Sequence, residues 1–157
     1  MYAVSIPELG SEAFIWDMAK RETIKKLSLP KKRILGKQIG IGLVRFGADN
    51  VYLASFDGKL WVSEPSGTLF EMAIDTRHNG LPNVFDINET SSLVAFVFWE
   101  GQLELWDLFS GKKVAEVTTG HKGAVTDVRI KPDASSVITA GKDGSVRIWS
   151  LEKTEPV

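Results

Sequence analysis

Three side chains near the end of the sequence have the chemical types of a nucleophilic triad: His121, Thr139 and Asp143. In a triad, a carboxylate orients an imidazole, which accepts the proton of a hydroxyl nucleophile. Catalysis also needs donors for the oxyanion, and no oxyanion-hole motif accompanies these residues. The sequence has 2 histidines and neither a phosphate-binding loop nor a metal-ligand spacing. We therefore expect no enzyme activity, no cofactor and no metal.

The composition is that of an ordinary soluble domain, with 157 residues, 43% hydrophobic and 25% charged. The sequence has 0 cysteines, which excludes disulfides and cysteine-ligated metals and fits a reducing compartment. Its apolar runs fall far short of the roughly 20 residues of a membrane helix. Residues 1–15 also lack the pattern of a secretory signal. We expect an intracellular protein, cytoplasmic or nuclear.

The basic residues are concentrated in one segment, although the net charge is only -1. Residues 20–37 hold eight cations and one anion, a charge of +7, which leaves -8 on the remainder. Such asymmetry marks either a solvated face or a surface for an anionic partner. Binding of nucleic acid or another anionic ligand through residues 20–37 is therefore an alternative function.

The elements that must position these side chains repeat along the chain. A period of 20 to 50 residues is typical of repeat architectures. A shift of 43 residues superposes Asp57 on Glu100, His78 on His121, Glu100 on Asp143, and Trp106 on Trp149.

Each repeat consists of short β-rich segments separated by turn residues, which predicts antiparallel strands. In the last repeat, Lys142-Asp143-Gly144 is a tight hairpin signal between two of these strands. Four strands in 43 residues predict the blade of a β-propeller. The strands that we expect include residues 1–6, 12–17, 23–29, 83–87, 93–98, 102–107, 112–118, 124–130, 136–140 and 145–150.

Several dipeptides in these repeats resemble those of WD repeats. Trp149-Ser150 follows Gly120-His121 with 28 residues from His to Trp, and Trp106-Asp107 and Ile15-Trp16-Asp17 lie upstream. The resemblance covers nearly the whole chain and is most specific in the last repeat. It implies an all-β fold made of WD-repeat β-propeller blades, each a four-stranded antiparallel sheet.

The resemblance also implies a buried chain of hydrogen bonds running from Trp149 through Thr139 and His121 to Asp143. The indole only donates, the hydroxyl and imidazole do both, and the carboxylate only accepts, so the four groups can satisfy one another. In this arrangement the Thr139 hydroxyl lies behind the indole, which further disfavours a catalytic triad.

The earlier repeats retain only some of these residues. In the preceding repeat Phe96 occupies the hydroxyl position, so we expect its chain of hydrogen bonds to be broken. The partial equivalents are His78, Glu100 and Trp106 in that repeat, and Asp57 alone in the one before, where Lys37, Leu53 and Ser63 hold the other positions and Trp61 lies two residues before Ser63.

The resemblance places two groups of residues in loops on one face of the blades, where a rigid scaffold usually binds its partners. Phe98 and Trp99, beside an acid, are candidates for a protein-binding hot spot; the alternative is packing between blades. The second group could receive an acidic peptide, a phosphate or nucleic acid, the alternative being a solvated loop. It consists of Lys31, Lys32, Arg33 and Lys37.

Seven such blades would need roughly 300 residues, so the chain corresponds to about half of a ring. We expect residues 1–29 to end a first blade, 36–74 and 78–118 to form the next two, and 120–157 to form a fourth without its last strand. This predicts a fragment, a truncated product or a half-propeller completed by another copy. The expected function is a non-catalytic protein–protein interaction scaffold in a larger complex, with other proteins as partners.

Overall fold

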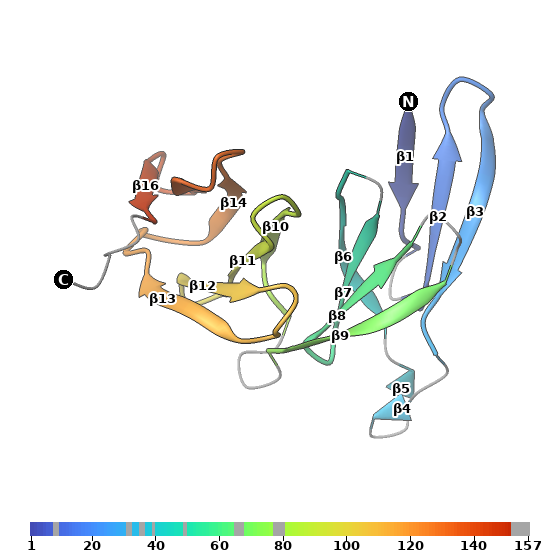
Figure 1. Cartoon of the computed structure of the whole chain (residues 1–157), viewed down its shortest axis with the longest axis horizontal. Coiled ribbons are helices and arrows are strands. Elements are labelled where there is room, and N and C mark those ends of the chain that lie inside the picture. Colours follow the sequence, from blue (N-terminus) through green and yellow to red (C-terminus); the bar gives the residue numbers. More distant parts are fainter. Residues whose placement is uncertain are drawn as a thin grey trace. The chain divides into compact units, whose positions relative to one another are not determined.

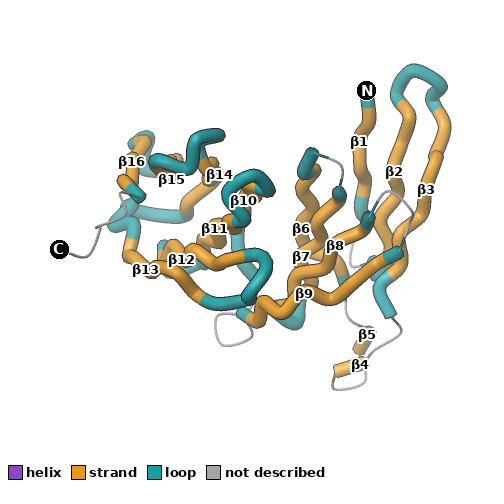
Figure 2. The backbone as a smooth tube through the Cα atoms, viewed as in Figure 1, coloured by secondary structure: helices purple, strands orange, loops and turns teal. Residues whose placement is uncertain are grey.

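The computed structural model describes residues 1–7, 10–30, 33–34, 37–38, 40–48, 50–64, 68–76 and 81–151, with the backbone alone for 33–34 and 37–38. Within these ranges all regular secondary structure is β-strand (Figure 2). The described residues accordingly include no helix long and apolar enough to cross a membrane.

Sixteen strands are present in the described residues; Figure 1 labels all of them except β15, which is labelled in Figure 2. Where the sequence analysis gave limits, the observed ends differ by at most one residue, because alternating burial and turn residues define short strands well. The strands are β1 (Tyr2–Ser5), β2 (Glu12–Asp17), β3 (Glu22–Ser28), β4 (Arg33–Ile34), β5 (Lys37–Gln38), β6 (Ile41–Phe46), β7 (Val51–Ser55), β8 (Lys59–Ser63), β9 (Leu69–Asp75), β10 (Val84–Asn88), β11 (Leu93–Val97), β12 (Gln102–Asp107), β13 (Lys113–Thr118), β14 (Val125–Ile130), β15 (Ser136–Gly141) and β16 (Val146–Ser150).

The chain divides into two compact units, Met1–Leu81 (unit 1) and Pro82–Val157 (unit 2). Unit 1 contains the sheets β1-β2-β3 and β6-β7-β8-β9 and the small hairpin β4-β5. Unit 2 contains the sheets β10-β11-β12-β13 and β14-β15-β16. All pairings among the described residues are antiparallel between consecutive strands, so the predicted all-β class with four-stranded antiparallel blades is confirmed. The limits of the individual blades stay a prediction.

Glycines form the tight turns between the second and third strands of three sheets. Gly58, Gly101 and Gly144 have φ values of 76°, 75° and 76°. This left-handed region is accessible to glycine without steric cost. The glycines are 43 residues apart, so the turn geometry follows the period of the sequence.

The core of each unit is formed by two neighbouring sheets that pack face to face. In unit 1, β2 and β3 supply apolar side chains that pack against those of β6, β7 and β8. In unit 2, side chains from β11 and β12 pack against side chains from β14 and β15. The buried members in unit 2 are Ala95, Val97, Leu103, Leu105, Val125, Val128, Ile130 and Val137.

Candidate interaction site

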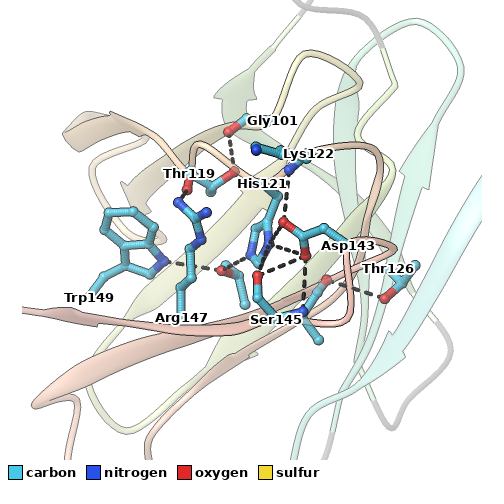
Figure 3. Close-up of polar contacts among 11 residues, drawn as sticks. Gly101, Thr119, His121, Lys122, Thr126, Asp143, Ser145, Arg147 and Trp149 are labelled. Atoms are coloured by element: carbon cyan, nitrogen blue, oxygen red, sulfur yellow. Dashed lines mark hydrogen bonds and ion pairs between the residues drawn. The ribbon is translucent and has the colours of Figure 1, made fainter.

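The last sheet and its loops bring together the four residues that the sequence analysis assigned to a polar chain, of which Figure 3 labels His121, Asp143 and Trp149. The Trp149 indole donates to Thr139 Oγ1 at 3.2 Å, and Thr139 Oγ1 lies 2.9 Å from His121 Nε2. His121 Nδ1 lies 3.1 Å from Asp143 Oδ1. Because Thr139 is fully buried and already accepts the indole N–H, its hydroxyl does not reach the surface as a nucleophile would have to. The stabilising role of the four residues stays a prediction.

The carboxylate of Asp143 holds the loop before β14 and its own hairpin together. It accepts hydrogen bonds from the Ser145 hydroxyl at 2.7 Å and from the backbone N–H groups of Lys122 and Ser145 at 2.8 and 3.0 Å. These bonds, the Ser145 hydroxyl first, lower the pKa of Asp143 well below its usual value. The sequence analysis missed Ser145, although a hydroxyl two residues after a hairpin aspartate is a signal for such a turn.

Three other tryptophans also donate an indole N–H to an acceptor. Trp61 and Trp106 lie on the third strands of their sheets, and Trp16 lies on β2, which corresponds to a third strand. For Trp16, Trp61 and Trp149 the acceptor is a hydroxyl two residues beyond the residue that pairs with the tryptophan on the neighbouring strand. Such diagonal neighbours lie on the same face of a sheet. The additional bonds are Trp16 to Ser5 Oγ at 2.8 Å, Trp61 to Ser55 Oγ at 3.2 Å and Trp106 to Glu104 Oε2 at 2.9 Å.

In the sheet β6–β9 the sequence analysis placed Leu53 where the hydroxyl should be and expected Asp57 alone to be retained, but the structure has a hydroxyl, that of Ser55, as the acceptor of the Trp61 indole. The tryptophan lies two residues earlier than expected, and its acceptor Ser55 lies two residues later. A displacement by two residues preserves the face of a strand, so the interaction survives the shift. The Ser55 hydroxyl in turn donates to Asp57 Oδ1, which keeps the predicted Asp57 in the polar chain.

In the sheet β10–β13 an acid on the third strand replaces the missing hydroxyl. Phe96 pairs with Glu104 across the strands, and the fully buried Glu104 accepts both the Trp106 indole and, at 3.0 Å, Lys113 Nζ. The predicted partial equivalent Glu100 is exposed instead. His78 lies outside the described residues. Glu104 was missed, although an acid between Leu103 and Leu105 in a buried strand is an unusual feature of the sequence.

Three loops of unit 2 form a surface that we call the loop cluster: residues 98–101, 119–124 and 141–145. Thr119 donates to Gly101 O through both its backbone N–H and its hydroxyl, each at 2.8 Å. Lys142 N donates to Ala124 O at 2.9 Å, and the Asp143 bonds connect the same two loops. These bonds hold the middle loop to the hairpin on either side of it (Figure 3).

The loop cluster exposes Trp99, whose relative exposure is 76%, whereas the neighbouring Phe98 is only 4% exposed. The Phe98 ring packs against Phe96, with 6.3 Å between the ring centroids. The prediction that Phe98 contacts a partner is therefore corrected: successive side chains at the end of a strand point to opposite sides. Trp99 remains the candidate hot spot.

The sequence analysis missed equivalents of these features 43 residues earlier. Phe56 is exposed at the hairpin position of Trp99, and Thr76 donates to Gly58 O as Thr119 does to Gly101 O. Applying the 43-residue shift to Trp99 and Thr119 would have found both.

The structure describes only some of the basic residues that the sequence analysis proposed as a binding site. Lys31 and Lys32 lie outside the described residues, and only the backbone of Arg33 and Lys37 is described, in the hairpin β4-β5. Three preceding lysines contact other groups of unit 1. Lys20 lies 3.9 Å from Glu22, Lys26 lies 2.7 Å from Glu12, and Lys25 donates to Glu64 O at 2.9 Å.

Comparison with known proteins supports the repeat assignment. The family model described as WD domain, G-beta repeat matches residues 111–150. The chain is 34% identical over 88 residues to apoptotic protease-activating factor 1 of Mus musculus, which covers 56% of this chain and 7% of that protein. It is 32% identical over 91 residues to mitochondrial division protein 1 of Mycosarcoma maydis, and this match covers 58% of this chain and 11% of that protein. The chain thus spans only a small part of these relatives.

Solved structures with the same fold include two designed proteins. The computationally designed Ika4 protein superposes with a TM-score of 0.66 at 19% identity, covering 96% of this chain and 86% of that chain. The designed Ika8 protein has the same TM-score and identity, and the match covers 96% of this chain but only 43% of the Ika8 chain. At this identity the similarity concerns the fold alone.

Proposed function

Since this chain belongs to the WD-repeat family, we propose that it is a non-catalytic scaffold for protein–protein interaction. WD repeats generally bind other proteins within complexes, and the family generally lacks catalytic activity. The finer proposal is that the loop cluster of unit 2 is a contact surface for a partner protein. An intracellular location, cytoplasmic or nuclear, belongs to the same proposal and is supported by the absence of cysteine.

The observation that carries this proposal is the exposure of Trp99 on a hairpin whose backbone is fixed. A tryptophan offers a large contact area, and hot spots of interfaces are enriched in this residue. The hydrogen bonds between the loops mean that little conformational entropy is lost when a partner binds. With the exposed Glu100 beside it, Trp99 suits a partner that offers an apolar pocket flanked by a Lys or Arg side chain.

The experiment compares the proteins captured by the wild-type chain, by Trp99→Ala and by Phe109→Ala. Phe109 is also a highly exposed aromatic residue, but it lies in the turn after β12, outside the loop cluster. We expect Trp99→Ala to weaken binding of a purified partner by about 30-fold, the effect of a hot-spot residue of about 2 kcal/mol, and Phe109→Ala to leave it unchanged.

Partners that bind Trp99→Ala as tightly as the wild type would refute the loop cluster as the contact surface. Binding that is lost instead in the triple variant Lys31→Glu, Lys32→Glu, Arg33→Glu, and that weakens steeply with salt, would favour the anionic ligand.

A further inference from the structure

One face of the last sheet exposes apolar side chains that have the pattern of a sheet interface. In β15 and β16, Ile138 pairs with Ile148 and Ala140 pairs with Val146, so all four side chains lie on the same face. Val146 is 65% exposed and Ile148 is 70% exposed. Exposed apolar residues gathered on one sheet face mark an interaction site.

The preceding sheet shows what such a face does when it is covered. The 43-residue shift superposes Ile138, Ala140, Val146 and Ile148 on Ala95, Val97, Leu103 and Leu105. Leu103 and Leu105 are 1% and 4% exposed, because side chains of β14 and β15 pack against this face. The β15–β16 face therefore repeats, residue by residue, a face that another sheet buries within unit 2.

The first sheet has an exposed face that resembles the face with which β14 and β15 cover the preceding sheet. In the covering sheet, Val137 pairs with Trp149, and Trp149 donates to Thr139. In the first sheet, Ala3 pairs with Trp16, and Trp16 donates to Ser5 in the same diagonal geometry. Trp16 and Ser5 are exposed, and Ala3 is half-buried.

We propose that the β15–β16 face docks onto the β1–β2 face of a second copy of this chain. This contact would repeat between copies the packing by which consecutive sheets already bury their faces inside each unit. It is head-to-tail, because two different faces meet. A longer chain of the same fold exists in the designed Ika8 protein, of which this chain covers 43%. The proposal goes beyond the proposed function, since neither face includes the loop cluster.

The test is the mass of the chain in solution, measured by sedimentation equilibrium over a range of concentrations. We expect assembly into a dimer of 17.3 kDa chains. Ile148→Glu places a charge on one face and Ala3→Lys on the other, and each variant alone should be monomeric. An equimolar mixture of Ile148→Glu and Ala3→Lys should recover the dimer, because one junction then pairs opposite charges and the other is unmodified.

Val114→Glu and Phe109→Ala are the matched controls, since both residues are exposed but lie outside the two faces. Both variants should assemble as the wild type does, and far-UV circular dichroism should show that every variant is folded. A larger oligomer that Ile148→Glu disperses also supports the docking. A folded wild-type chain that stays monomeric, or a dimer that Ile148→Glu leaves intact, would overturn the proposal.

Discussion

His121 is the central residue of the polar chain in the last sheet. Its side chain is fully buried, with one ring nitrogen at 2.9 Å from a hydroxyl and the other at 3.1 Å from a carboxylate oxygen. The hydroxyl accepts the indole N–H and can donate to Nε2, so that Nδ1–H donates to Asp143. This order gives each group one role that it can fill, and it closes the loop 119–124 onto β15 and the hairpin 141–145.

We predict that His121→Ala lowers the free energy of unfolding by about 1–3 kcal/mol, because Thr139 and Asp143 lose a buried partner. Urea unfolding followed by tryptophan fluorescence measures the change. Lys122→Ala is the control: its side chain is exposed, and the variant keeps the backbone N–H that donates to Asp143. Equal unfolding midpoints for His121→Ala and the wild type would show that the polar chain contributes nothing to stability.

The pH dependence of stability tests the Asp143 carboxylate separately. Hydrogen bonds lower its pKa in the folded state below the ordinary value of 3.8. Its contribution is therefore fully present at pH values above 3.8 and is lost as the pH falls below that value toward the folded-state pKa. We predict that wild type and Asp143→Asn differ by a constant amount of stability near neutral pH.

This difference should shrink as the pH is lowered below about 3.8, which thermal unfolding in a series of buffers measures. Asp107 and Asp133 also have a lowered pKa, but both are present in the two proteins being compared, so their effects cancel. A difference that stays constant throughout the acid range would contradict the assignment.

At the scale of the elements, the burial of a sheet face decides how much each apolar residue on it contributes to the free energy of unfolding. Leu105 and Ile148 occupy equivalent positions in the repeat, but the first is buried by a neighbouring sheet and the second is 70% exposed. Side-chain chemistry is nearly the same at the two positions. The difference in burial therefore follows from the presence of a covering sheet.

We predict that Leu105→Ala destabilises the chain by about 2–5 kcal/mol, since it removes buried apolar volume and leaves a cavity. Ile148→Ala should change stability by less than about 0.5 kcal/mol when measured at low concentration, where copies of the chain are separate. Chemical unfolding of both variants gives the comparison. A large loss in Ile148→Ala under these conditions would mean that another part of the chain covers its face.

At the scale of the whole molecule, the repeat distinguishes features that recur from sheet to sheet from positions that vary. The tryptophan hydrogen bonds and the hairpin glycines recur in several sheets with different acceptors and neighbours, so we expect them to serve the fold. The hairpin position of Trp99 varies instead, because Phe56 holds it one repeat earlier and Lys142 holds it in the next sheet. In a fold of this kind the exposed loop residues differ from repeat to repeat, whereas the positions between the sheets remain apolar.

The sequence alone determined the limits of the strands that it predicted and the 43-residue period, and its resemblance to WD repeats grouped His121, Thr139, Asp143 and Trp149. The limits and the period follow from local patterns: alternating side chains, turn residues with restricted φ, and residue types that recur at constant spacing.

Only the tertiary structure decided that Ser55 and Glu104 are the acceptors for Trp61 and Trp106, and that Phe98 is buried while Trp99 is exposed. It alone also showed that the face with Ile148 is open. Acceptors chosen across strands depend on register, and burial depends on which sheet covers a face. Both are set by contacts between residues distant in sequence, which a local pattern does not contain.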